Sequence, residues 1–188
     1  MKIKYWAATA FAALCCFDTA AEAAVINAGD KVLVVYYSVS GNTQAIAEQI
    51  ARETGADTVT IEPAEEYPSA YKKLTERAKK EIADGHKPEL KNKPATIDGY
   101  DVVFVGSPCW WSTIAPPVAS FLTAYDFSGK KIIPFMTHGG SGLGHSEADI
   151  KNLLPAAVQL EKGRAFWGRN AENAGEEVKS WIKELKND

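Results

Sequence analysis

The feature that most constrains the fold is a change of apolar period early in the chain. Residues 31–37 form an almost continuous apolar run that ends at Ser38, and a helical stripe then extends to Gly55. The stripe consists of Ile46, Ala47, Ile50 and Ala51. A continuous run is typical of a strand covered on both faces, whereas the stripe indicates an amphipathic helix. The segment therefore predicts a strand, a tight loop and a helix.

The same alternation repeats along the rest of the chain. Further strands are predicted at 58–61, 101–106, 131–136 and 158–160, the last with 165–167 as an optional continuation. Further helices are predicted at 71–82, from the Pro116-Pro117 pair to Tyr125, around 150–154 and at 178–185. Such alternation favours an α/β fold, a three-layer α/β/α sandwich around a five-stranded parallel sheet. The irregular stretch 85–99 is interpreted as a surface connection.

The first residues have the layout of a signal peptide. Lys2 and Lys4 precede an uncharged run at 5–17, and Ala21 and Ala23 fit a cleavage site. The run is shorter than the roughly 20 helical residues that cross a bilayer, so no permanent membrane anchor is expected. We predict a signal peptide at 1–23, a mature domain at 24–188 and a periplasmic location. An uncleaved anchor is the alternative.

Composition limits the class of protein. The 188 residues suit one domain, and the apolar fraction of 46% with a charged fraction of 24% is ordinary for a globular protein. The net charge of -3 argues against a nucleic-acid partner. After cleavage of the leader, Cys109 would be the only thiol, so no intramolecular disulfide is expected.

The loop after the first predicted strand has the composition of a phosphate site. In a parallel sheet, ligands bind beyond the carboxyl ends of the strands. Hydroxyl groups of Ser38, Ser40 and Thr43 are available there, Gly41 permits a tight turn, and Asn42 begins the helix, whose amino end favours anions. The loop predicts a site for a monophosphate without a cation. The alternative is an ordinary turn in which Ser or Asn caps the helix.

The loop after the third predicted strand contains large apolar side chains. Its residues Pro108, Cys109, Trp110 and Trp111 would suit a flat ring ligand, because aromatic side chains stack on such rings. The alternative is that the two tryptophans belong to the core or to the surface.

The loop after the fourth predicted strand is rich in glycine, which lets backbone amides approach a ligand closely. The residues with this expected role are Thr137, His138, Gly139, Gly140 and Gly142. Ser141 does not fit a nucleophile elbow, because Leu143 stands where that motif needs glycine. No acidic or thiol set completes a metal site with His138 or His145, so no metal is expected.

Together the loops resemble those of the flavodoxin family, and more closely its flavodoxin-like oxidoreductases than its short acidic carriers. The resemblance covers Lys31 to about Lys186 and is strongest at Tyr37-Ser38-Val39-Ser40-Gly41-Asn42-Thr43. It implies strand order 2-1-3-4-5, FMN as cofactor with its phosphate on 38–43, and the ring between 108–111 and 137–142. The redox chemistry then belongs to the cofactor, and no catalytic side chain is expected.

Two departures from the family concern the role. One-electron carriers of the family have a glycine beside flavin N5 whose peptide turns over on reduction, and 107–113 contains no glycine. They are also strongly acidic, unlike this chain. We expect an FMN protein that acts outside the cytoplasm in electron transfer or as a quinone-reductase-like oxidoreductase, with a quinone-like molecule or a protein as redox partner. The alternatives are a one-electron carrier and a non-redox binding module.

Overall fold

The computed structural model describes residues 24–187; the predicted signal peptide lies outside them. A parallel sheet of six strands forms the centre, in the order β2-β1-β3-β4-β5 with β6 also paired to β4. The strands are β1 (Val32–Tyr36), β2 (Asp57–Thr60), β3 (Val102–Pro108), β4 (Lys131–His138), β5 (Gln159–Leu160) and β6 (Arg164–Trp167). The predicted strand order and parallel pairing are confirmed.

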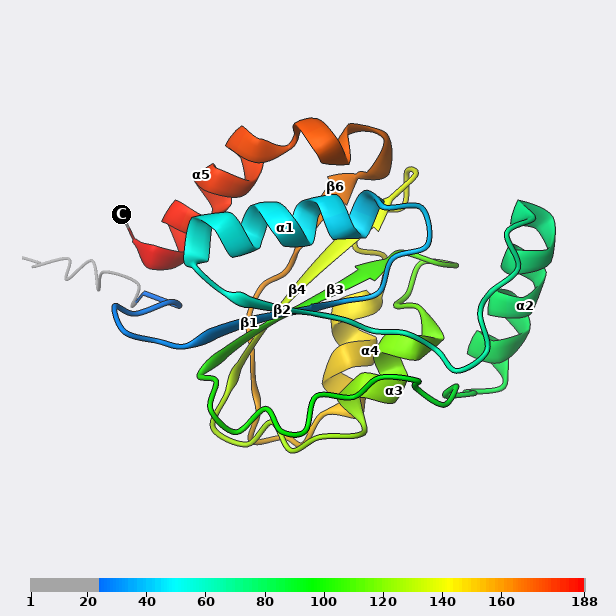
Figure 1. The fold of residues 1–188 in the computed structure, drawn as a ribbon, viewed down its shortest axis with the longest axis horizontal. Coiled ribbons are helices and arrows are strands. Elements are labelled where there is room, and N and C mark those ends of the chain that lie inside the picture. Colours follow the sequence, from blue (N-terminus) through cyan, green and yellow to red (C-terminus); the bar gives the residue numbers. More distant parts are fainter. Residues whose placement is uncertain (1–23, 188) are drawn as a thin grey trace, which may run out of the picture.

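Helices cover both faces of the sheet (Figure 1). They are α1 (Asn42–Thr54), α2 (Tyr71–Ala83), α3 (Pro116–Leu122), α4 (Ser146–Leu153) and α5 (Gly175–Lys186), with a 3₁₀ helix η1 (Gly168–Asn173) before α5. Helices α1 and α5 lie on one face, and α3 and α4 on the other (Figure 1). The three-layer α/β/α sandwich is therefore confirmed. Among the described residues, no helix combines the length and the apolar character that crossing a membrane would need.

The continuous apolar run of β1 is explained by the two helix layers. Leu33 and Val35 pack in a cluster with residues of α2, α3 and α4, whereas Val34 and Tyr36 pack in a second cluster with residues of α1 and α5. Because successive side chains of a strand point to opposite faces, both sets must be apolar. Each fully buried aliphatic side chain contributes about 1.5–3 kcal/mol.

The fifth strand position is occupied by two short strands. Residues 161–163 separate β5 from β6 and lie opposite only residues 133–134 of β4. Pro134 has no N–H to donate to a ladder, and the Gly163 N–H donates instead to Glu147 Oε1 at 2.7 Å. A Cβ on Gly163 would lie 2.8 Å from the Pro134 carbonyl oxygen, so a glycine permits this close approach. The optional continuation at 165–167 is thus a separate strand.

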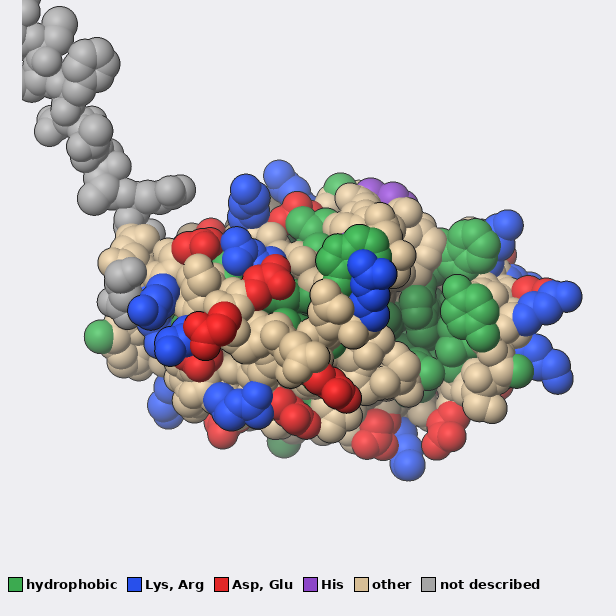
Figure 2. All heavy atoms as spheres, turned by 90° about the horizontal axis from the view of Figure 1, so that it is seen from above, with side chains coloured by type: hydrophobic (Ala, Val, Ile, Leu, Met, Phe, Trp, Pro, Cys, Tyr) green, Lys and Arg blue, Asp and Glu red, His purple; other side chains and the backbone are tan. Residues whose placement is uncertain are grey.

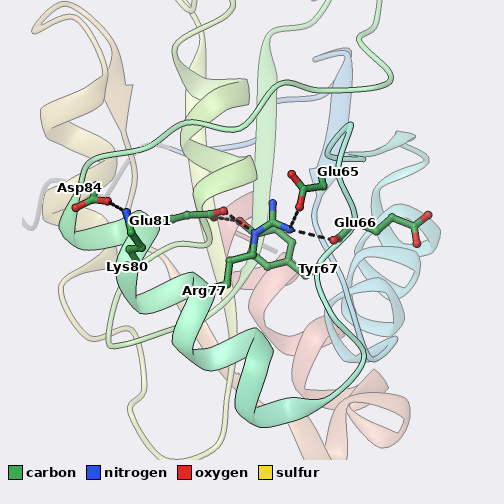
Figure 3. A network of polar contacts seen from close by, with 7 residues as sticks. All are labelled: Glu65, Glu66, Tyr67, Arg77, Lys80, Glu81 and Asp84. Atoms are coloured by element: carbon green, nitrogen blue, oxygen red, sulfur yellow. Dashed lines mark hydrogen bonds and ion pairs between the residues drawn. The ribbon is translucent and has the colours of Figure 1, made fainter.

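Helix α2 occupies a different place from the other helices. It lies beyond the carboxyl ends of the strands, at the right of Figure 1. A polar network around Arg77 ties it to the segment that precedes it (Figure 3). The Arg77 guanidinium donates to Glu81 Oε1 at 2.7 Å, to Glu65 Oε1 at 2.8 Å and to the Glu66 carbonyl at 3.1 Å. The Tyr67 hydroxyl also donates to Glu81. The network ties α2 to the segment before it, beyond the carboxyl ends of the strands.

Candidate functional site

The three predicted ligand loops meet at the carboxyl edge of the sheet. The hydroxyl oxygens of Thr43 and Thr137 are 2.8 Å apart, which joins the first loop to the third. The Cys109 N–H donates to the Thr137 carbonyl at 2.8 Å, which joins the second loop to the third. Both threonines are buried. The fold thus brings residues from 94 positions apart into direct contact.

The first loop leaves donor groups without protein partners. Gly41 is the N-cap of α1, with φ 83° and no side-chain hydrogen bond to the helix amides. The alternative in which Ser or Asn caps this helix is therefore wrong. Ser38 Oγ is buried and has no hydrogen-bond partner among the described residues. A buried hydroxyl without a partner is costly, so its position beside an uncapped helix end fits an anionic ligand.

The second loop contains a tight turn with an unusual backbone. Trp110 and Thr113 exchange two backbone hydrogen bonds, of 2.9 and 3.0 Å. The central residues Trp111 and Ser112 have φ values of 51° and 66°. Both lie in the left-handed region that normally favours glycine or asparagine, as type I′ turns require. The turn forms although its sequence contains no glycine.

The two tryptophans of the second loop have different surroundings. The half-buried Trp110 packs edge-on against Tyr37, with ring centroids 5.7 Å apart, and against Tyr67 at 5.0 Å. Trp111 is turned toward α2, where its Nε1 donates to the Thr75 carbonyl at 3.0 Å. It is 52% exposed. An apolar hollow of about 240 Å³ lies between α2 and residues 109–111.

The third loop is shaped by His138. Its Nδ1 accepts a hydrogen bond from the Gly140 N–H at 2.9 Å, and burial lowers the pKa of this histidine. A neutral imidazole is what such an acceptor requires. The glycines that follow have positive φ, 146° at Gly140 and 60° at Gly142. Gly139 and Gly140 are exposed, so their backbone is accessible at this edge.

Trp167 is a site residue that sequence reasoning missed. It ends β6 at the same edge, 43% exposed, with its ring centroid 4.8 Å from that of His138. The Arg169 guanidinium lies over the Trp167 ring, with its central carbon 4.6 Å from the ring centroid. The following residue, Gly168, approaches Asn42 so closely that a Cβ there would lie 2.9 Å from Asn42 Nδ2. The sequence feature that could have indicated Trp167 is its place at the carboxyl end of the predicted strand continuation at 165–167.

Exposed apolar surface gathers at this edge. The exposed large hydrophobic residues of the described chain are Val39, Tyr71, Trp111 and Trp167. Each lies in a loop after a strand, at the end of β6 or at the start of α2. Figure 2 shows hydrophobic side chains gathered at the right-hand end of the molecule. Apolar surface concentrated in one region marks a binding site more often than scattered residues do.

Comparison with known proteins gives the family. The sequence model of the family described as flavodoxin matches residues 31–185. The chain belongs to the flavodoxin family. Its sheet has the strand order that the resemblance implied.

Solved structures of other proteins are similar to this chain over most of its length. A candidate flavoprotein from Bacteroides eggerthii DSM 20697 is 31% identical, with a TM-score of 0.72 over 83% of this chain and 98% of that one. Another, from Bacteroides uniformis ATCC 8492, is 30% identical, with a TM-score of 0.74 over 82% and 99%. A flavoprotein from Lactobacillus acidophilus NCFM in complex with FMN is 22% identical, with a TM-score of 0.63 over 77% and 97%, and shares the fold.

Curated relatives match a shorter part of the chain. An NAD(P)H dehydrogenase (quinone) of Cupriavidus metallidurans is 31% identical over 97 residues, 49% of this chain and 45% of that protein. A second protein of that name, from Gluconacetobacter diazotrophicus, is 29% identical over 96 residues, 48% of this chain and 44% of its own. The matches thus span about half of the length of these relatives.

Proposed function

We propose that this protein binds FMN and transfers electrons with it. Membership in the family and the FMN-bound structure from Lactobacillus acidophilus support FMN as the cofactor. The observation that carries the proposal is the buried Ser38 hydroxyl, which has no partner among the described residues and lies in the loop before the uncapped helix α1. A phosphate monoester supplies acceptors for such donors, and the helix dipole favours its charge.

The phosphate would be held by the first loop through Ser38, Ser40 and the backbone of residues 41–43. Thr43 already shares its hydroxyl with Thr137, so its side chain fixes the third loop as well as the first. Asn42 lies so close to Gly168 that a Cβ on Gly168 would be 2.9 Å from Asn42 Nδ2, which brings the residue after β6 next to this loop. These contacts would orient the cofactor relative to the rest of the edge.

The ring of FMN would lie among residues 108–111, 137–142 and Trp167. FMN supplies the redox chemistry when bound, and the protein tunes it through its surroundings. Apolar aromatic walls exclude water and disfavour an anionic ring, which lowers the tendency to accept a second electron. His138 keeps the third loop in place while neutral, because its Nδ1 accepts from the Gly140 amide.

The redox role that the site supports best is that of an oxidoreductase or electron-transfer protein with a quinone-like acceptor. The apolar hollow between α2 and residues 109–111 offers room for a small apolar molecule beside the proposed ring site. The two curated relatives, named NAD(P)H dehydrogenase (quinone), favour the same acceptor class. The layout of residues 1–23 supports a place of action outside the cytoplasm, in the periplasm.

A one-electron carrier for a protein partner is the second candidate. The exposed aromatic side chains at the edge favour it, because electron-transfer partners dock through small apolar surfaces. The two roles differ in turnover. The oxidoreductase predicts multiple turnovers of an uncharged naphthoquinone with a chemical or enzymatic electron donor, whereas the carrier predicts none.

The test is made on the purified mature protein. Isothermal titration with FMN, followed by its visible spectrum, should show one tightly bound flavin per chain. Reduced protein mixed with 2-methyl-1,4-naphthoquinone should return to the oxidised spectrum over many cycles. Absence of FMN binding would contradict both roles, and FMN binding without quinone turnover would exclude the quinone oxidoreductase.

A further inference from the structure

Helix α2 carries a charge opposite in sign to that of the whole chain. Its residues 71–83 include five Lys or Arg side chains and two Glu, whereas the chain has a net charge of -3. Glu81 is buried and paired with Arg77, so Glu76 is the one exposed acidic side chain within this helix. The exposed lysines of α2 are Lys72, Lys73, Lys79 and Lys80. The outer surface of α2 is therefore cationic.

Two exposed aromatic side chains lie on the same face of α2 as two of these lysines. Trp111 Nε1 donates to the Thr75 carbonyl at 3.0 Å, and Lys79 Nζ lies 4.8 Å from a ring centroid of Trp111. Lys72 and Tyr71 precede Thr75 by three and four positions, so they share this face. Tyr71 and Trp111 are both exposed. We call Tyr71, Lys72, Lys79 and Trp111 the α2 patch.

The α2 patch points away from the acidic side chains around Arg77. The helix turns about 200° between Arg77 and Lys79, so Glu65 and Glu81, which pair with Arg77, lie on the other side of α2 (Figure 3). Helix α2 also lies at one end of the molecule (Figure 1). Figure 2 shows Lys and Arg side chains beside the hydrophobic ones at that end. An extended anionic surface can therefore contact the patch.

The apolar hollow between α2 and residues 109–111 borders the patch. Tyr71 and Trp111 line both the patch and the hollow, and Leu74 and Ala78 of α2 line the hollow as well. Its volume is about 240 Å³. A small apolar molecule that leaves a surface in contact with the patch would thus reach the hollow without crossing bulk water.

We propose that the α2 patch docks on an anionic lipid bilayer, from which the hollow takes a lipid-soluble quinone. Tyr and Trp side chains are favoured at the bilayer interface, because their rings are apolar and their polar ends stay hydrated. Lysines beside them are attracted to anionic headgroups. An apolar substrate class favours a bilayer over an acidic protein as the partner. The quinone step rests on the proposed function, whereas the membrane contact does not.

The first test is sedimentation of the mature apo-protein with lipid vesicles. Vesicles of phosphatidylcholine mixed with phosphatidylglycerol are anionic, and pure phosphatidylcholine vesicles are the neutral comparison. The wild type should bind the anionic vesicles more tightly, and added salt should weaken that binding. Absence of binding to either kind of vesicle would overturn the proposal and would favour an acidic protein as the partner of the patch.

Charge variants locate the contact. Lys72→Gln/Lys79→Gln should lower the affinity for anionic vesicles by about fivefold per lysine. Lys179→Gln/Lys183→Gln is the matched control, because both of these lysines are exposed on α5, on a different part of the molecule. It should bind like the wild type. Equal losses in the two double variants would show a non-specific charge effect and contradict docking through α2.

Tryptophan fluorescence tests the aromatic part of the contact. Brominated phosphatidylcholine in the anionic vesicles quenches tryptophans that enter the interface. Trp111→Phe keeps an aromatic ring but removes the fluorophore, so quenching should largely disappear. Trp167→Phe is the control, because Trp167 is also exposed but lies outside the patch. Quenching that is lost in Trp167→Phe and kept in Trp111→Phe would overturn docking through the α2 patch.

The last measurement separates this proposal from the proposed function. Reduced FMN-loaded wild type should be reoxidised faster by a long-chain isoprenoid quinone in anionic vesicles than in neutral ones. A water-soluble sulfonated naphthoquinone should react at the same rate in both suspensions. Equal rates with the long-chain quinone would contradict delivery from the membrane. If FMN does not bind, the proposed function and the quinone step both fail, and sedimentation of the apo-protein still decides the membrane contact.

Discussion

The hydroxyl oxygens of Thr43 and Thr137 lie 2.8 Å apart and join the start of α1 to the end of β4. Both side chains are almost fully buried, at 1% and 4% exposure. The pair is therefore the most direct physical link between the proposed phosphate loop and the proposed ring loop. Loss of either hydroxyl should disturb both.

The Thr43–Thr137 link should behave as a coupled pair. Thr43→Val or Thr137→Val leaves one buried hydroxyl without a partner, so each should lower the free energy of unfolding by about 1–3 kcal/mol. The double variant should cost less than the sum of the single variants. Urea denaturation of the apo-proteins measures all four states. Additive losses would contradict a direct hydrogen bond.

Ser38→Ala should separate binding from stability. The Ser38 hydroxyl is buried without a partner, so its removal should leave the apo-protein as stable as the wild type or slightly more stable. FMN affinity should fall about ten- to hundredfold, since a hydrogen bond to a charged phosphate contributes about 1.5–3 kcal/mol. Ser146→Ala is the matched control. The Ser146 hydroxyl is also buried without a partner among the described residues, but Ser146 is the first residue of α4 and lies outside the 38–43 loop. Equal affinity losses in both variants would exclude a specific role for Ser38.

Gly144→Ala and Gly142→Ala test the contact between the two ring loops. Both glycines have similar positive φ, 55° and 60°, so the backbone strain of an alanine is matched. Only at Gly144 would the new Cβ meet the Ser112 carbonyl, at 2.1 Å. Gly142→Ala should cost about 1 kcal/mol of unfolding free energy, and Gly144→Ala at least about 2 kcal/mol more. Thermal unfolding of the apo-proteins gives the comparison, and similar losses would show that the loops separate easily.

Stability should fall at alkaline pH because of two buried phenols. Burial raises the pKa of Tyr37 and of Tyr67, and the hydrogen bond to Glu81 raises the pKa of Tyr67 further. Unfolded tyrosine ionises at about pH 10, so the unfolded state loses these protons before the folded state does. The stabilisation is therefore full below about pH 10 and is lost as the pH rises above it.

The measurement is the free energy of unfolding in urea between about pH 8 and pH 11, where the unfolded phenols titrate. Tyr67→Phe should lower the starting stability, because Glu81 loses its hydroxyl donor, and should also flatten the fall with pH. Tyr71→Phe is the control, since its phenol is 81% exposed. The same slope in Tyr67→Phe and the wild type would contradict the effect of burial.

Several parts of the site followed from local sequence. The run at residues 31–37 and the hydroxyl-rich loop after it predict a buried strand and an anion site, because period and side-chain chemistry are local properties. The structure confirms the strand and shows a buried donor at Ser38. The assignment of individual ligand contacts in the three loops stays a prediction.

Other parts could not follow from local sequence. The glycine-free loop at 107–113 gave no sign that Trp111 and Ser112 adopt the left-handed conformation. The turn is bonded to Asp149 and His145, which lie more than 30 positions later in the chain. Trp167 was counted only as the end of a strand, and its pairing with His138 depends on the split of the last strand into β5 and β6.

The sequence by itself predicted the layers and the sheet edge for a ligand, because these depend on apolar period and on residue types within short segments, and its resemblance to the family predicted the kind of ligand. The tertiary structure decided which groups are free to bind and which are already engaged. It paired the Thr43 hydroxyl with that of Thr137, left the Ser38 hydroxyl without a partner among the described residues, and bonded Thr113 to Asp149 of α4. Hydrogen bonds between distant segments form only when the fold brings them together, so no local pattern encodes them.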